Sequence, residues 1–225
     1  AQPSAPVGSG DSSVEQVGIL TTAPPVATDG CEPSIEVFPR PAGFSRISVR
    51  SECRKDELVR FTYGGVVYSR RLDANGALDV DIDCFLGLSH AVDIAFKDGS
   101  VYEATLVADD IDKVAKIAVV WNQTIDLDLH AFEDGAPFND PRHLWNSRPG
   151  SYAAALQAIA SSGRGHGFLS SIADSRGSGS RFEVYTYLYP PQRNTGFVKF
   201  SVDYQTRGAR PFGASCGDGA AAKPG

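Results

Sequence analysis

The stretch WNQTIDLDLHAFEDG, residues Trp121 to Gly135, decides the fold. Apolar and polar residues alternate in its middle, and side chains alternate across a β-strand, so Asp126, Asp128 and His130 share one face. The opposite face, from Ile125 to Ala131, is apolar. The stretch therefore predicts a β-strand with one face in a hydrophobic core and one polar face, as in an antiparallel sheet.

The same alternation recurs along the chain between glycine turns. ELVRFTYGGVVYSRRL, residues 57–72, predicts a hairpin at Gly64-Gly65, and RLDANGALDVDID predicts a turn at Asn75-Gly76. We expect an all-β protein of two antiparallel β-sandwich domains. The second domain is expected to contain one short helical insertion, residues 151–162, followed by a long mobile loop rich in glycine and serine, residues 163–180.

Composition divides the chain into four parts. Residues 1–30 are rich in Pro, Ser, Ala and Gly and predict a flexible N-terminal arm or linker. Residues 31–109 predict a small immunoglobulin-like sandwich, residues 110–217 a larger sandwich, and residues 218–225 a disordered tail. The arm holds one apolar cluster, Val17 to Leu20, which leaves open a second reading: an arm that adds a strand to a sheet of this chain or another.

Charge and hydropathy exclude several partners. The 225 residues carry a net charge of -6 and contain no run of lysine or arginine, so nucleic-acid binding and attachment to a lipid surface are not expected. No apolar run approaches the roughly 18 residues that a membrane span needs. The chain contains no methionine and starts at Ala1, so we expect a mature secreted or periplasmic protein from which a signal segment has been removed.

The four cysteines fit an oxidising compartment, because their number is even and no Cys-x-x-Cys pair is present. Of the three connectivities, the predicted one joins Cys53 to Cys84 within the first sandwich and Cys31 to Cys216 across the chain. The alternative is four reduced thiols.

The carboxylates of Asp126 and Asp128 are expected about 7 Å apart. At that distance they repel by about 0.6 kcal/mol in water but by about 2.4 kcal/mol at an effective dielectric near 20. If loops cover them, a bound cation relieves the repulsion, and oxygen ligands favour calcium. The alternatives are a hydrated strand face without metal and a transition metal that uses His130.

A resemblance rests on these same residues. VVWNQTIDLDLHAFEDG, with HLWN, FEVYTYLYP and GFVKFSVDY further on, resembles the DUF2135 family of bacterial envelope β-sandwiches of unknown function. More distantly the stretch is similar to tellurium-resistance-type domains, whose Asp-Leu-Asp strand contributes to calcium sites. The whole chain also resembles secreted alphaproteobacterial proteins. The resemblance implies Asp126 and Asp128 as first calcium ligands, with Asn122 and Asp134 as loop ligands.

The favoured function is a non-enzymatic envelope or extracellular interaction or assembly module, calcium-stabilised if the metal site exists. Its partner is expected to be a protein or a second copy of the chain, and the N-terminal arm is one candidate for the contact. The first alternative is a carbohydrate or small-ligand binding protein, since aromatic side chains with polar tips suit sugar rings or protein partners. The second alternative is a metal-assisted hydrolase that uses Asp126, Asp128 and His130. The residues expected on the ligand or partner surface are Trp145, Tyr185, Tyr187 and His130.

Overall fold

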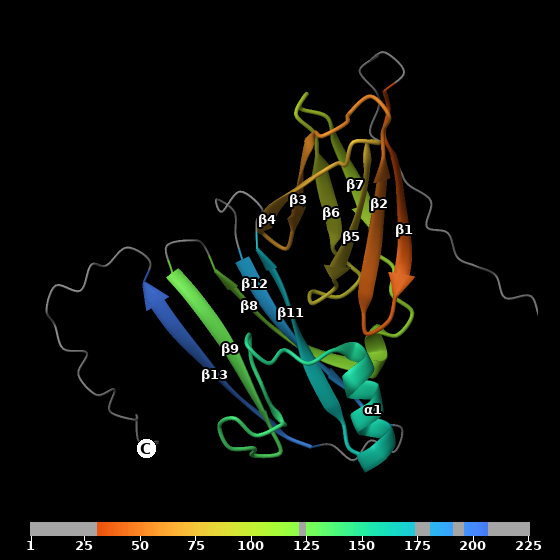
Figure 1. Ribbon diagram of the computed structural model, residues 1–225. Helices are drawn as coiled ribbons and strands as arrows, with labels where there is room; N and C mark the ends of the chain where they lie inside the picture. Colours follow the sequence, from red (N-terminus) through yellow and green to blue (C-terminus); the bar gives the residue numbers. More distant parts are fainter. Residues whose placement is uncertain (1–30, 122–124, 174–180, 191–195, 207–225) are drawn as a thin grey trace, which may run out of the picture.

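The structure is a computed structural model that describes residues 31–121, 125–173, 181–190 and 196–206 (Figure 1). Thirteen strands and one α-helix lie in these residues, and the strands form four sheets whose neighbours all pair antiparallel. The all-β fold expected from the sequence is confirmed. Within the described ranges, no helix has the length and apolar character that a membrane crossing requires.

Seven strands form the first unit, the upper part of Figure 1. One sheet has the order β1-β2-β5 and the other β4-β3-β6-β7. The predicted hairpin at Gly64-Gly65 joins β3 to β4, with both glycines at positive φ. The strand bounds are β1 Ser34–Arg40, β2 Phe44–Arg50, β3 Leu58–Tyr63, β4 Val66–Arg71, β5 Ala77–Asp83, β6 Ala91–Ala95 and β7 Val101–Thr105.

The second unit holds two facing sheets, with the orders β11-β12-β8 and β10-β9-β13. Helix α1 begins after Ser151, whose side chain accepts a hydrogen bond from the Ala154 amide, and ends before Gly163 in the left-handed conformation. The helix is the one expected from the sequence. The element bounds are β8 Val114–Trp121, β9 Ile125–Glu133, β10 His143–Leu144, α1 Tyr152–Ser162, β11 His166–Ala173, β12 Arg181–Leu188 and β13 Val198–Thr206.

The prediction of a loop over residues 163–180 is wrong for its first half. His166–Ala173 forms β11, which pairs along its length with β12. Apolar residues on both faces of HGFLSSIA explain the strand: Phe168 is buried on one face of β11 and Leu169 on the other. Residues 174–180 lie outside the described residues.

Both faces of the sheet β11-β12-β8 are covered. Tyr185 and Tyr187 of β12 pack toward β9, whereas Phe182 and Val184 pack into the core of the first unit. The ring of Phe182 lies 5.4 Å from the ring of Phe85, which belongs to the first unit. The two units therefore share packed side chains.

A buried ion pair joins the units at the same place. Nζ of Lys116 on β8 lies 2.7 Å from Oδ1 of Asp83 at the end of β5, and donates a second hydrogen bond to Thr186. The hydroxyl of Ser170 on β11 donates to the other carboxylate oxygen of Asp83. Both charged side chains are almost fully buried, so this contact strongly favours one relative arrangement of the units.

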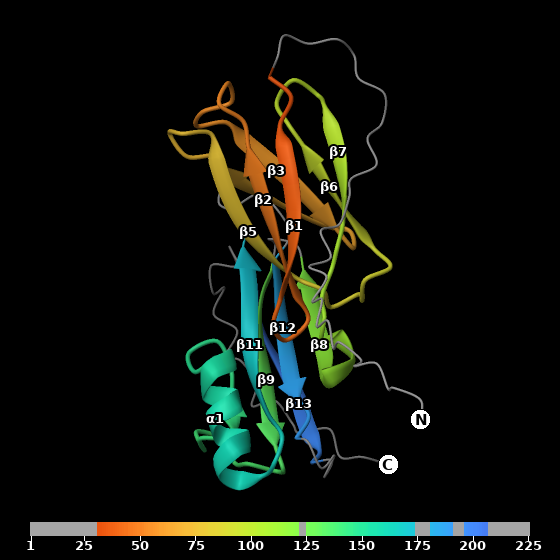
Figure 2. The same cartoon turned by 90° about the vertical axis from the view of Figure 1, so that its right-hand side faces the viewer.

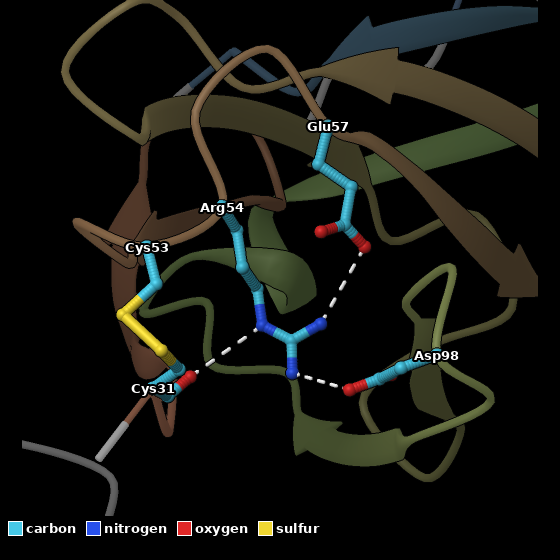
Figure 3. Close-up of a disulfide and its surroundings, with 5 residues drawn as sticks. All are labelled: Cys31, Cys53, Arg54, Glu57 and Asp98. Atoms are coloured by element: carbon cyan, nitrogen blue, oxygen red, sulfur yellow. Dashed lines mark hydrogen bonds and ion pairs between the residues drawn. A yellow bond between two sulfur atoms is a disulfide. The ribbon is translucent and has the colours of Figure 1, made fainter. Parts of the chain in front are cut away.

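The predicted disulfide pairing is wrong, because Cys31 bonds Cys53 (Figure 3). The register of β1 and β2 explains the pair: Ser34 lies opposite Arg50, and three more residues outward on each strand bring Cys31 opposite Cys53, with their Cα atoms 5.6 Å apart. Cys84, the predicted partner of Cys53, is a buried free thiol, and Cys216, the predicted partner of Cys31, lies outside the described residues.

Arg54 fixes the loop that carries this disulfide. Its guanidinium donates to the carbonyl of Cys31 and contacts the carboxylates of Glu57 and Asp98 (Figure 3). The Arg54 hydrogen bond holds the pKa of Asp98 far below its ordinary value. The N-terminal end of β1 is thus anchored covalently and electrostatically.

Candidate functional site

The predicted two faces of β9 are confirmed. Leu129 and Ala131 are buried in the core between the two sheets of the second unit. Asp128, His130 and Phe132 lie on the other, outer face, in register with Asp203, Ser201 and Lys199 of β13.

Of the four calcium ligands implied by the resemblance, Asp126 and Asp134 do not come together. Asp126 and Asp134 are eight residues apart on one extended chain, which corresponds to roughly 26 Å, so they cannot bind one ion. Asp126 contacts Arg181 at 3.1 Å, and Asp134 contacts Arg142 at 2.9 Å. Asn122 lies outside the described residues. Across the ranges that the structure describes, no group of three or more His, Cys, Asp or Glu side chains is arranged to hold a metal.

Aromatic rings gather on the outer face of β9 instead. We call this set of five residues the aromatic–histidine face; it consists of His130, Phe132, Phe138, His143 and Trp145. Phe132 and His143 lie directly opposite each other on β9 and β10, with ring centroids 4.2 Å apart and planes within 2°. The next pair comes from His130, two residues before Phe132, and Trp145, two residues after His143. Their ring centroids lie 5.1 Å apart and their planes are within 17° of parallel.

Phe138 comes from the loop between β9 and β10 and lies against His143, with ring centroids 4.5 Å apart. Its side chain is 57% exposed. Trp145 is partly exposed, as predicted for a ligand surface, whereas both histidines are buried, so the prediction that His130 lies on that surface is wrong. The face therefore presents the rings of Phe138, Trp145 and Phe132 to solvent over a buried pair of imidazoles.

Arg148 ties together the two turns that carry these rings. Trp145 and Arg148 exchange backbone hydrogen bonds across a tight turn. The Arg148 guanidinium donates to the carbonyls of Asn139 and Asp140, in the loop of Phe138. The exposed rings are thus held by a defined framework, as a preorganised binding surface requires.

The hydrogen bonds of the histidines define their tautomers. The Asn139 amide donates to Nδ1 of His143, so the proton of the neutral His143 ring is on Nε2. Nε2 of His143 lies 2.8 Å from Nδ1 of His130 and donates to it. The proton of His130 is then on Nε2, which faces Asp203 at 3.5 Å and Asp128 at 3.9 Å.

Burial lowers the pKa of His143, and the neighbouring His130 and Arg148 lower it further. This favours the neutral ring that the chain of hydrogen bonds requires. The relay from the Asn139 amide through both imidazoles ends at the two carboxylates, which lie opposite each other on β9 and β13. Like charges in directly opposite positions repel, and the Nε2–H group of His130 between them reduces that repulsion.

A small hollow lies beside Asn146, the residue that follows Trp145 in the chain. It is lined by Asn146, Pro149, Leu169, Ser170, Ser171 and Glu183. The Asn146 amide donates to Asp128, and the carboxylate of Glu183 accepts from the Leu129 amide. Burial raises the pKa of Glu183, and the charge of Asp128 contributes. Polar groups therefore make up most of the lining of the hollow.

Tyr185 and Tyr187, predicted on a ligand surface, are buried in the core of the second unit, so that prediction is wrong. The Tyr185 hydroxyl donates to Glu133, which is itself buried. Burial raises the pKa of Tyr185 strongly, and the adjacent Glu133 carboxylate adds to the effect. The tyrosines therefore stabilise the interior.

Sequence reasoning missed the polar cluster around Glu133. Its carboxylate accepts from Tyr185 and the Gly167 amide and lies 2.5 Å from Nδ1 of His166 and 3.4 Å from Arg142. One signal was available: Glu133 has the same strand parity as Leu129 and Ala131 and therefore faces inward. Its partners lie 9 to 52 positions along the chain, where no local pattern indicates them.

Neither protein-family models nor curated proteins match the chain. Among solved structures, one similar chain comes from a 1.5-MDa bacterial ice-binding adhesin described for host cell surface retention; the TM-score is 0.26, the identity 12%, and the match covers 80% of this chain and 65% of that one. Another comes from a Ca²⁺-stabilized adhesin that helps an Antarctic bacterium reach out and bind ice, with a TM-score of 0.22, 12% identity and coverage of 73% and 43%. The chain thus spans less than two thirds of either structure.

Proposed function

We propose that this protein is a non-catalytic interaction module of an extracellular or envelope compartment, and that the aromatic–histidine face binds its partner. The observation that carries the proposal is the pair of solvent-facing rings, Phe138 and Trp145, held by Arg148 over two buried histidines. Aromatic and arginine side chains are enriched where protein interfaces bind most strongly. The Cys31–Cys53 disulfide supports an oxidising compartment.

A protein partner fits the surroundings of the face. Asp128 and Asp203 lie at its rim on neighbouring strands, and Lys199 follows on β13 on the same side of the sheet. A central apolar patch with a charged rim is the arrangement of a non-obligate protein interface. The charged residues of the rim would steer the partner toward the face. The rings of Phe138 and Trp145 would contribute most of the binding free energy.

The test is site-specific photo-cross-linking in cells that make the protein. A photoreactive phenylalanine replaces Phe138 in one variant and Phe38, a 40% exposed residue of β1, in the control variant. The proposal expects a discrete adduct from position 138 that is absent from position 38 and is lost when Trp145→Ala is added. No adduct, the same adduct from both positions, or an adduct that survives Trp145→Ala would overturn it.

A carbohydrate ligand is the second candidate, and the partly exposed indole of Trp145 favours it. An indole with carboxylates nearby suits a sugar ring, which stacks on the aromatic face and donates hydroxyl hydrogen bonds. On a glycan array this function expects binding that Trp145→Ala abolishes and that Tyr204→Ala, on an exposed residue of β13, leaves unchanged. Equal signals from both variants would refute it.

A further inference from the structure

One edge of the second unit is open. β8 is the last strand of the sheet β11-β12-β8, and among the described residues no strand pairs with its outer edge. The eight residues of β8 correspond to roughly 26 Å of strand, along which every second amide and carbonyl points away from β12. An unpaired edge of this length is a template for another strand.

The composition of β8 offers no protection against such pairing. Its sequence is VAKIAVVW, and its single charge, Lys116, is turned into the buried ion pair with Asp83. Ile117 is 42% exposed on one face of the strand, and Val120 is 45% exposed on the other. Natural edge strands are usually guarded by outward charges, prolines or bulges, and β8 has no outward charge and no proline.

The neighbouring edge provides a comparison. β13 is the last strand of the facing sheet, and both β8 and β13 lie toward the right of Figure 2. β13 exposes the apolar residues Val202 and Tyr204, but Lys199 and Asp203 are also exposed along it and add charge to this strand. β8 differs from β13 in exposing apolar side chains without any outward charge.

We propose that residues 14–21 of the same chain add to the free edge of β8 as a further strand. This segment, VEQVGILT, contains the apolar cluster of the N-terminal arm. In an extended chain Val17 and Ile19 lie on one face and Leu20 on the other, which matches an edge that exposes Ile117 on one face and Val120 on the other.

The length and anchoring of the arm support an occupant from the same chain. The disulfide anchors Cys31 before β1, which begins at the end of the first unit far from β8 (Figures 1 and 2). The ten residues from Thr21 to Cys31 reach up to about 35 Å when extended, whereas the seven residues of β1 span about 23 Å. A tethered segment also acts at an effective concentration near millimolar, which favours it over a second copy in dilute solution.

The experiment measures amide hydrogen exchange by NMR on the full chain. The variant Val17→Asp/Ile19→Asp places two charges in the segment, and Ala5→Asp/Val7→Asp is the matched control elsewhere in the arm. We expect the outward amides of β8 to exchange at least tenfold faster in the first variant than in the wild type or the control. Amides of β9 should keep the same rates in all three proteins, which shows that the fold is intact.

Two results would overturn the proposal. Equal exchange rates of the β8 amides in the wild type and in Val17→Asp/Ile19→Asp would show that the segment does not cover this edge. Protection that increases with protein concentration, together with a dimer in sedimentation, would assign the cover to a second copy.

Discussion

Removing the ammonium group of the buried ion pair between the two units should destabilise the protein strongly. Lys116 donates to Asp83 and Thr186, and its ammonium lies 4.4 Å from the ring centre of Phe44. In Lys116→Met the Asp83 carboxylate remains buried, and among the described residues the Ser170 hydroxyl is the hydrogen-bond donor left to it. Breaking a buried pair by removing one partner typically costs about 3–5 kcal/mol, and we expect a loss in this range.

The double variant Asp83→Leu/Lys116→Met separates this cause from lost packing. Because it removes both charges and keeps apolar volume, its stability should return to within about 1 kcal/mol of the wild type. The assay is urea unfolding followed by far-UV circular dichroism, which reports both units, and by the fluorescence of Trp121 and Trp145, which lie in the second unit.

Two outcomes would refute the reasoning. A loss below about 1 kcal/mol in Lys116→Met would mean that the pair is solvated, as exposed pairs contribute only this much. An equal loss in the single and double variants would mean that the side-chain volume matters and the charge does not.

Three further predictions concern the disulfide, the histidines and calcium. Cys31→Ser/Cys53→Ser opens a loop with a sequence separation of 22 and should lower the free energy of unfolding by about 3 kcal/mol in urea titration; an unchanged midpoint would contradict the bond's role. Because the pKa of His143 is lowered in the folded protein, its contribution to the free energy of unfolding is fully present above the ordinary histidine pKa near 6.5 and should be lost as the pH falls below it. His143→Gln should make the free energy of unfolding depend less on pH. The same pH dependence in the wild type and the variant would count against the buried neutral ring. Millimolar calcium should leave the thermal midpoint unchanged against a chelator, because carboxylates at both ends of β9 already pair with arginines; a rise that Asp128→Asn abolishes would reverse this conclusion.

Local patterns in the sequence predicted local structure well. The alternation in IDLDLHA places Leu129 in the core and His130 on the outer face, and the Gly64-Gly65 pair makes a hairpin because both residues adopt positive φ without strain. Helix α1 follows from its serine cap and its alanine-rich composition. Each of these depends on residues within one strand, turn or helix.

Contacts between residues on different strands could not be predicted from local sequence patterns. Cys31 joins Cys53 because of the register of β1 and β2, which depends on the hydrophobic core of the whole unit. The aromatic–histidine face needs the loop that returns β10 beside β9 and so brings His143 opposite Phe132. Tyr185 is buried because both faces of its sheet are covered, which a single strand pattern does not show.

The most direct test of the proposed binding face measures how tightly the partner identified by cross-linking binds purified variants of the chain. By calorimetry, Trp145→Ala should weaken binding at least tenfold, as loss of a central aromatic residue does, whereas Phe197→Ser, on an exposed phenylalanine just before β13, should bind like the wild type. Equal affinities of the wild type and Trp145→Ala would contradict the assignment of this face as the binding surface.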